Sequence, residues 1–115
     1  MFAMSHCAAD CVVAHYNVMD PVTSAPETAS RYLAYEPGPQ GIRVHAISPE
    51  PLKTRVASDL KDFGLPLDEA ARQAPLTEPV HITDGGFACA CLATSLARWI
   101  TGGAACVDGG GIIFA

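Results

Sequence analysis

Residues 41–54 read Gly-Ile-Arg-Val-His-Ala-Ile-Ser-Pro-Glu-Pro-Leu-Lys-Thr, and the rest of the chain is organised around them. Apolar residues Ile42, Val44 and Ala46 alternate with polar ones, which is the periodicity of a β-strand. We expect this strand over residues 41–47. The Pro-rich polar loop that follows is the kind of segment that binds ligands in open α/β sheets, where the crevice lies beyond the carboxyl ends of the strands.

Composition limits the classes of protein that the chain can belong to. With 115 residues, half of them apolar, it predicts one domain with a core. The net charge of −5 excludes a nucleic-acid partner, and no apolar run is long enough to cross a membrane. The first nine residues lack the basic region of a secretory signal, and an odd count of five cysteines favours reduced thiols. We therefore expect a cytoplasmic protein.

The first helix is predicted over residues 25–36. Apolar residues already have helical spacing before residue 25, but Pro21 and Pro26 interrupt this pattern. A proline inside a helix costs about 3 kcal/mol of helix stability. Ser24 and Glu27 have the spacing of a capping box, which would let a helix begin afresh. We therefore expect the long helix to be broken before Ser24, with Tyr16 on a separate turn or loop.

The remaining elements predict half of a doubly wound fold. Residues 49–79 mix Pro, Gly and charge and suggest a flap over a site. Thr83 can cap a helix over residues 84–97, and a short buried strand is expected over 104–107. The order helix, strand, loop, helix, strand is typical of the C-terminal half of a Rossmann-type parallel α/β sheet.

Several motifs give the chain a family resemblance. In one register over nearly its whole length, it resembles the C-terminal half of bacterial enoyl-acyl-carrier-protein reductases, within the short-chain dehydrogenase/reductase superfamily. The motifs that carry this resemblance are Tyr16-Asn-Val-Met19, Arg31-Tyr-Leu-Ala34, Gly38-Pro-Gln-Gly-Ile-Arg-Val44, Ala46-Ile-Ser48, Pro51-Leu-Lys-Thr54, Lys61-Asp-Phe63, Ala74-Pro-Leu76, Ile100-Thr-Gly102 and Val107-Asp-Gly-Gly110.

The resemblance implies a function and two catalytic residues. Residues 1–115 would form a truncated reductase domain that lacks the N-terminal dinucleotide-binding half. The family reduces trans-2-enoyl thioesters on acyl carrier protein with NADH or NADPH, and it forms homotetramers. Tyr16 aligns with the family's catalytic tyrosine, whose phenol can donate a hydrogen bond to an oxyanion. His6 aligns with a second tyrosine.

The cofactor site implied by the resemblance is incomplete. Thr23 stands where the family has a lysine, and Glu50 adds a negative charge near the expected pyrophosphate. No Gly-rich turn follows a first strand, and residues 109–111 precede only four residues. The cofactor-binding residues implied by the resemblance are Thr23, Leu52, Lys53, Thr54, Arg55 and Val56.

Other interpretations stay open. The chain could be a non-catalytic remnant or an association module of the same fold, or a different short-chain dehydrogenase/reductase. Cys7, Cys11 and His15 would share one face of a helix, but their spacing is not that of a zinc knuckle, and we expect no metal site.

Overall fold

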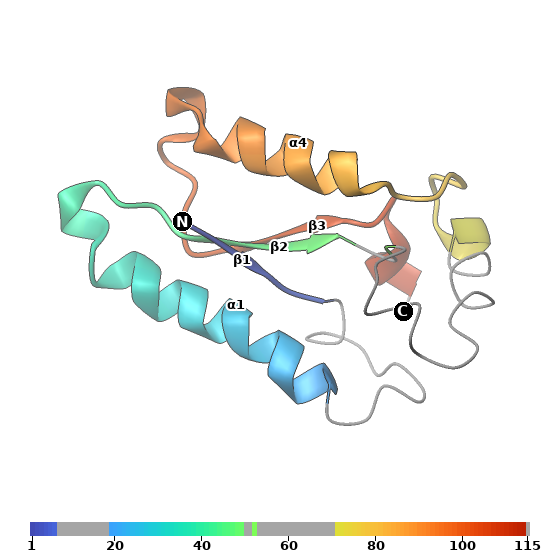
Figure 1. Cartoon of the computed structure of the whole chain (residues 1–115), viewed down its shortest axis with the longest axis horizontal. Coiled ribbons are helices and arrows are strands. Elements are labelled where there is room, and N and C mark those ends of the chain that lie inside the picture. The colour runs from blue at the N-terminus through green and yellow to red at the C-terminus, as the bar shows by residue number, and fades with distance from the viewer. Residues whose placement is uncertain (7–18, 50–51, 53–70, 115) are drawn as a thin grey trace.

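The computed structural model describes residues 1–6, 19–49, 52 and 71–114. Its centre is a three-stranded parallel sheet in the order β1-β2-β3 (Figure 1). The strands are β1 (Phe2–Met4), β2 (His45–Pro49) and β3 (Ala104–Val107). The parallel order confirms the predicted Rossmann-type α/β class.

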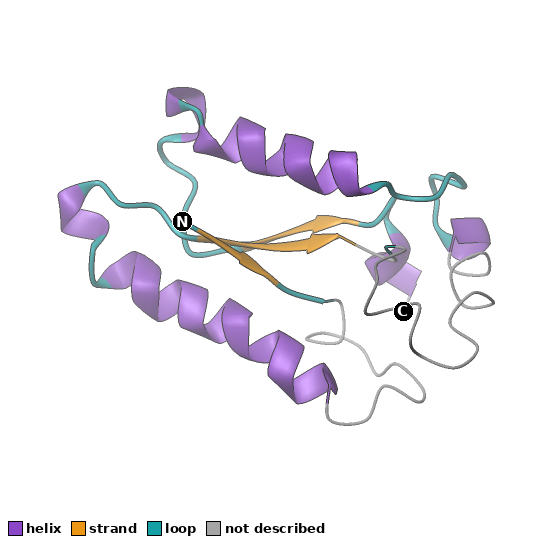
Figure 2. Ribbon diagram, viewed as in Figure 1, coloured by secondary structure: helices purple, strands orange, loops and turns teal. Residues whose placement is uncertain are grey.

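One long helix covers each face of the sheet. Helix α1 (Met19–Tyr35) packs on β1 and β2, whereas α4 (Ile82–Ala93) packs on β2 and β3 from the opposite side (Figures 1 and 2). Short 3-10 helices at Gly38–Gln40, Ser95–Ala97 and Gly111–Phe114 complete the described elements. No helix among the described residues is long and apolar enough to cross a membrane.

The core is narrow and is centred on β2. All five residues of β2 are buried, which is expected for a central parallel strand with a helix on each face. The buried hydrophobic residues of the described chain are mostly small: Ala34, Val44, Ala46, Ile47, Ala74 and Ala97. Many larger apolar side chains, including Phe2, Met4, Phe87 and Trp99, are exposed.

Helix α1 is continuous where a break was expected, so that prediction is wrong. Pro21 falls in the first turn, where a missing N–H has no helical acceptor to lose. The helix also continues through Pro26, whose carbonyl accepts a hydrogen bond from the Ser30 hydroxyl at 2.8 Å. The expected capping box is absent, because the Glu27 carboxylate accepts a hydrogen bond from the Ser5 hydroxyl at 2.6 Å.

The other elements differ from expectation mainly at their ends. Strand β3 has the predicted bounds, but the prediction that it is buried is wrong, because its residues are exposed or half-buried. Strand β2 lies later than predicted because Gly41, at φ 77°, ends a 3-10 turn. Helix α4 starts at Ile82 with His81 as its N-cap, so the predicted cap at Thr83 is wrong. The His81 N–H donates to the Asp84 carboxylate at 2.7 Å. Most of the predicted flap lies outside the described residues.

The C-terminal end of α4 is held by Arg43, which lies just before β2. Its guanidinium donates hydrogen bonds to four backbone carbonyls in and after the last turn of the helix. A cation at this position also suits the negative end of the helix dipole. The acceptors are the carbonyls of Leu92 at 2.5 Å, Ala97 at 3.0 Å, and Ala93 and Thr94 at 3.2 Å each.

Candidate active site

The carboxyl ends of the three parallel strands meet at one edge of the sheet (Figure 1). Ser5 and His6 follow β1, Leu52 lies three residues after β2, and Asp108 follows β3. In open α/β sheets this edge is where ligands bind. The structure therefore brings predicted site residues His6 and Leu52 to the edge that the sequence indicated.

Ser5 fixes the chain from which His6 projects. Its N–H donates to the Ile47 carbonyl at 2.8 Å, and its hydroxyl donates to the Glu27 carboxylate at 2.6 Å. Ser5 is buried, and a hydrogen bond to an ionised group is stronger than a neutral one. These bonds join the end of β1 to β2 and α1, next to the half-buried His6. Ser5 was not among the predicted site residues, because its only signal in the sequence is its place between a strand and His6.

The other predicted site residues are described only in part. Helix α1 begins near the carboxyl edge (Figure 1), and Thr23 lies on it, although only its backbone is described. Leu52 is half-buried. The predictions for Tyr16, Lys53, Thr54, Arg55 and Val56, and the open metal question at Cys7, Cys11 and His15, lie outside the described residues. No cluster of metal-binding side chains occurs in the part that is described.

The glycines after β3 form a closed turn. The Asp108 carboxylate accepts hydrogen bonds from the N–H groups of Gly110 at 2.9 Å and Ile112 at 2.8 Å. The Leu76 N–H donates to the Gly109 carbonyl at 3.0 Å, and an added Cβ at Gly110 would lie 3.0 Å from the Pro75 ring. Because this space is filled, the turn cannot cradle a phosphate.

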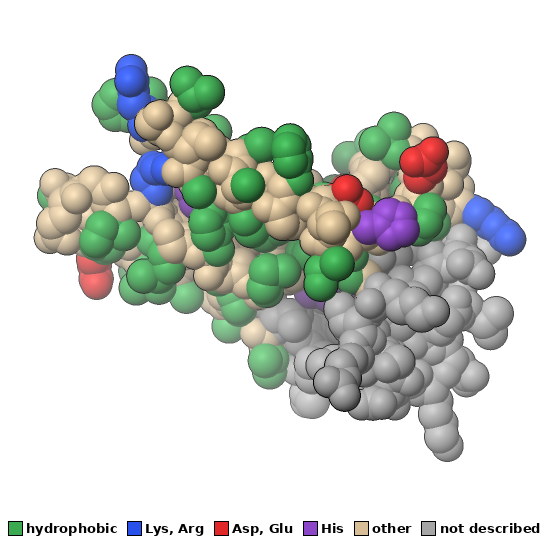
Figure 3. Space-filling view, turned by 45° about the horizontal axis from the view of Figure 1, so that its top comes forward, with side chains coloured by type: hydrophobic (Ala, Val, Ile, Leu, Met, Phe, Trp, Pro, Cys, Tyr) green, Lys and Arg blue, Asp and Glu red, His purple; other side chains and the backbone are tan. Residues whose placement is uncertain are grey.

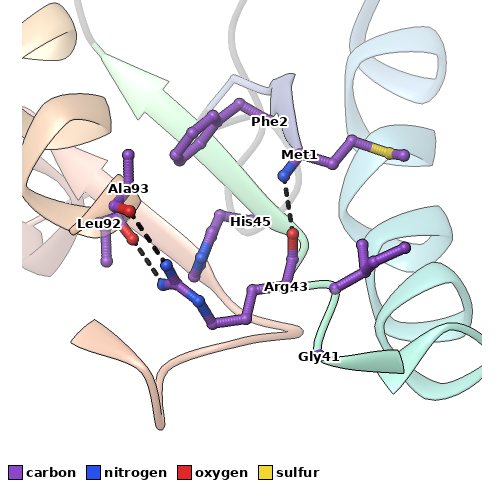
Figure 4. A pocket seen from close by; sticks show the side chains of 8 residues that line it. Met1, Phe2, Gly41, Arg43, His45, Leu92 and Ala93 are labelled. Atoms are coloured by element: carbon purple, nitrogen blue, oxygen red, sulfur yellow. Dashed lines mark hydrogen bonds between the residues drawn. The ribbon is translucent and has the colours of Figure 1, made fainter. Parts of the chain in front are cut away.

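A separate hollow lies at the opposite, amino edge of the sheet (Figure 4). It has a volume of about 280 Å³ and is lined by Met1, Phe2, Gly41, Ile42, Arg43, His45, Leu92 and Ala93. The His45 ring stacks on Phe2 with centroids 5.4 Å apart. Its Nε2 atom is buried without a hydrogen-bond partner in the described structure. The hollow is remote from the predicted ligand crevice.

Burial lowers the pKa of His45 below its usual 6.5, and the charges of Arg43 and the terminal ammonium lower it further. In the unfolded chain this imidazole gains a proton near pH 6.5, but in the folded chain it stays neutral to lower pH. We therefore expect the free energy of unfolding to fall as pH drops below about 6.5, by up to about 1.4 kcal/mol per pH unit.

Urea unfolding between about pH 7.5 and about pH 5.5 measures this loss. The variant His45→Asn removes the titrating group and serves as control, because the remaining histidines and carboxylates still titrate in it. The variant should show a clearly shallower dependence on pH. Equal slopes for the two proteins would refute the assignment to His45.

Comparison with known proteins identifies the family. A family model described as enoyl-(acyl carrier protein) reductase matches residues 1–111. The chain belongs to this family. It is 36% identical over 110 residues to the enoyl-acyl-carrier-protein reductase (NADH) of Escherichia coli, covering 96% of this chain and 42% of that protein. It is 38% identical to the Aquifex aeolicus enzyme of the same name, of which it covers 40%.

Solved structures of the family agree with this assignment. The Aquifex aeolicus enoyl-acyl-carrier-protein reductase (NADH) superposes with a TM-score of 0.90 at 38% identity, over 97% of this chain and 43% of that one. A Bacillus cereus reductase, solved with NADP+ and an indole naphthyridinone, gives 0.94 at 34% identity, over 99% of this chain and 44% of that one. The chain thus spans about two fifths of the length of these relatives.

Some motif residues that carry the resemblance have structural roles. Arg43 clamps α4, and the Thr101 hydroxyl accepts a hydrogen bond from the Val44 N–H at 3.0 Å. The Gly102 N–H donates to the Val44 carbonyl at 2.8 Å, with Gly102 at φ 75°. These hydrogen bonds join the start of β2 to the segment before β3. The role of these motif residues is therefore to hold the sheet together rather than to bind substrate or cofactor.

Proposed function

We propose that residues 1–115 form the carboxyl-terminal part of an enoyl-acyl-carrier-protein reductase domain, active only with the amino-terminal part of the fold. The reaction is the reduction of a trans-2-enoyl thioester, with NADH or NADPH as the hydride source. The observation that carries the proposal is the carboxyl edge, where His6, Leu52 and the start of α1 converge in a fold of this family.

Each candidate residue has a proposed role. Tyr16 and His6 donate hydrogen bonds to the thioester carbonyl oxygen, where negative charge develops during reduction. The bonds that hold Ser5 keep His6 at this edge. Thr23 occupies the place of a cation that would otherwise lower the pKa of the tyrosine. The cofactor loop comprises Leu52, Lys53, Thr54, Arg55 and Val56.

The proposed partners follow those of the family. The substrate is an enoyl thioester on acyl carrier protein, in cytoplasmic fatty acid synthesis. The assembly is a homotetramer of completed domains.

We expect that the isolated chain does not bind NADH at micromolar concentration. The turn at Gly109 and Gly110 is filled, position 23 lacks a cation, and Glu50 repels phosphate. Titration of the purified chain, followed by nicotinamide fluorescence, tests this expectation. A saturable signal at micromolar protein would overturn it and make the chain a nucleotide-binding unit in its own right.

One observation favours the second candidate, a non-catalytic association module. Phe87, Leu96 and Trp99 are 72%, 94% and 87% exposed, and Figure 3 shows hydrophobic side chains over the visible surface. Where exposed apolar side chains form a contiguous patch, the patch marks an interaction site. The two candidates differ in turnover after the amino-terminal part is supplied, since only the reductase gains activity.

A further inference from the structure

The face of α1 that packs on the sheet carries polar residues. Helix α1 contacts β1 and β2, and its buried or half-buried positions include Glu27, Ser30 and Ala34, which have the spacing of one helix face. Ser30 is 1% exposed, and its hydroxyl donates within the helix to the Pro26 carbonyl at 2.8 Å. Glu27, in contrast, has a hydrogen-bond partner on another element.

That partner is Ser5, the residue that follows β1. The Ser5 hydroxyl donates to the Glu27 carboxylate at 2.6 Å, and Ser5 is 8% exposed. A carboxylate that loses water at this position needs such a donor, whereas an apolar side chain would pack there without a desolvation cost. A polar pair of this kind adds little net stability, but it fixes one arrangement of the groups that it joins.

The pair joins two parts of the candidate site that are distant in sequence. Ser5 immediately precedes His6, and the Ser5 N–H donates to the Ile47 carbonyl at 2.8 Å. Glu27 stands four residues after Thr23, so positions 23 and 27 lie one turn apart on the same face of α1, near the start of the helix (Figure 1). One hydrogen bond therefore sets where His6 lies relative to the turn of α1 that includes position 23.

We propose that Glu27 is a positioning residue of the candidate active site: through the Ser5 hydroxyl, it holds His6 at a fixed place relative to α1. The inference rests on the proposed function and deepens it, since His6 is there a donor to the thioester carbonyl and Thr23 is part of the cofactor site. A misplacement of about 1 Å in such a site costs about a hundredfold in rate. Glu27 acts only through Ser5 and takes no part in the chemical step.

The rival explanation is that Glu27 acts by its charge, one turn from position 23. Two substitutions separate the hydrogen bond from the charge. Ser5→Ala removes the bond and keeps the carboxylate, whereas Glu27→Gln keeps an oxygen acceptor for Ser5 and removes the charge. Positioning predicts that Ser5→Ala is harmful and that Glu27→Gln is tolerated, and a charge effect predicts the reverse.

The placement of His6 is measured on the 115-residue chain by nuclear magnetic resonance, without cofactor or substrate. The backbone order parameter of His6 should be about 0.85, as in rigid backbone, and should fall below about 0.6 in Ser5→Ala and in Glu27→Ala. Glu27→Gln should keep the value of the unmodified chain. Glu36→Ala is the matched control, because it removes an exposed carboxylate just after α1 and should change nothing at His6. An order parameter that is the same with and without the bond would overturn the proposal.

A kinetic comparison tests whether this placement matters for reduction. The chain is joined to the amino-terminal part of its Escherichia coli relative and carries Thr23→Lys and Glu50→Gly, while His6 is retained. Ser5→Ala and Glu27→Ala should each lower kcat at least about tenfold and leave the KM for NADH within about twofold. The double variant should lose no more than either single variant, because both remove the same bond. Glu27→Gln should keep most of kcat.

The kinetic results can also overturn the proposal. It is wrong if the two losses add, if Glu27→Gln loses as much as Ser5→Ala, or if an active protein keeps its full kcat in Ser5→Ala. A completed protein without turnover would instead contradict the reductase assignment, and the order parameters would still decide whether Glu27 positions His6.

Discussion

A repaired and completed domain should reduce a crotonyl thioester with NADH, whereas the 115-residue chain should not. The completed protein combines the amino-terminal part of the Escherichia coli relative with this chain carrying Thr23→Lys, His6→Tyr and Glu50→Gly. Thr23→Lys restores a cation, and His6→Tyr replaces an imidazole with a phenol donor. Glu50→Gly removes a negative charge that would repel the phosphate groups of the cofactor. We expect the repaired protein to exceed the unrepaired combination by about a hundredfold in kcat/KM, because a cation now stands beside the catalytic tyrosine and the charge that repels phosphate is gone.

One control shows whether the missing half is required for this gain. Thr23→Lys in the isolated chain should recover no activity, because the dinucleotide-binding half is still missing. Neither proline of α1 is replaced, since the helix is continuous through Pro21 and Pro26 and needs no straightening. If the unrepaired combination were as active as the repaired one, the roles given to positions 23 and 50 would be wrong.

Removing the Arg43 clamp should cause a large loss of stability. Arg43→Met leaves four carbonyls at the end of α4 without their charged donor. Hydrogen bonds to charged groups contribute about 1.5–3 kcal/mol each, but water can reach part of this site. We therefore expect a loss of about 3 kcal/mol, a large fraction of the stability of an ordinary domain. Urea unfolding of the purified chain measures it.

Arg31→Met provides a matched control on α1. Arg31 is exposed, and its guanidinium donates one hydrogen bond to the Thr28 hydroxyl at 3.3 Å, so its loss should cost less than about 0.5 kcal/mol. Arg43→Lys should fall between the two, because an ammonium group cannot span four carbonyls. Equal losses for Arg43→Met and Arg31→Met would show that the clamp contributes no stability.

Strand periodicity predicted β2 because a buried parallel strand leaves a local signal. The alternation around Val44 and Ala46 located β2 to within a few residues, and the apolar run before Asp108 gave β3 its bounds. The order of these elements was enough to identify the α/β class. The start of β2 was misplaced because Gly41 belongs to the preceding turn, which periodicity does not distinguish from a strand.

The errors in α1 and α4 come from contacts that are distant in sequence. Ser24 and Glu27 have the spacing of a capping box, but Glu27 bonds to Ser5, 22 residues away. The end of α4 is fixed by Arg43, which lies 49 residues from Leu92. Local spacing cannot reveal such partners, so the proline penalty was given too much weight in α1.

The candidate site was predictable only as far as the resemblance reached. The resemblance pointed to His6 and Leu52, which follow β1 and β2, and parallel topology brings the ends of these strands together. Ser5 was missed because its role depends on a hydrogen bond to the carboxylate of Glu27, which lies on α1. The closed turn at Gly109 could not be predicted, because Pro75 and Leu76, which close it, are distant in sequence.

The most direct test of the reductase assignment is the rate of NADH oxidation by the repaired, completed protein with a crotonyl thioester, measured with Tyr16 and with Tyr16→Phe. Removing one hydrogen-bond donor to the developing oxyanion should lower kcat by at least about a hundredfold while NADH affinity stays unchanged. If the completed protein binds NADH but turns over no enoyl thioester, or turns it over equally well with phenylalanine at position 16, the assignment is contradicted.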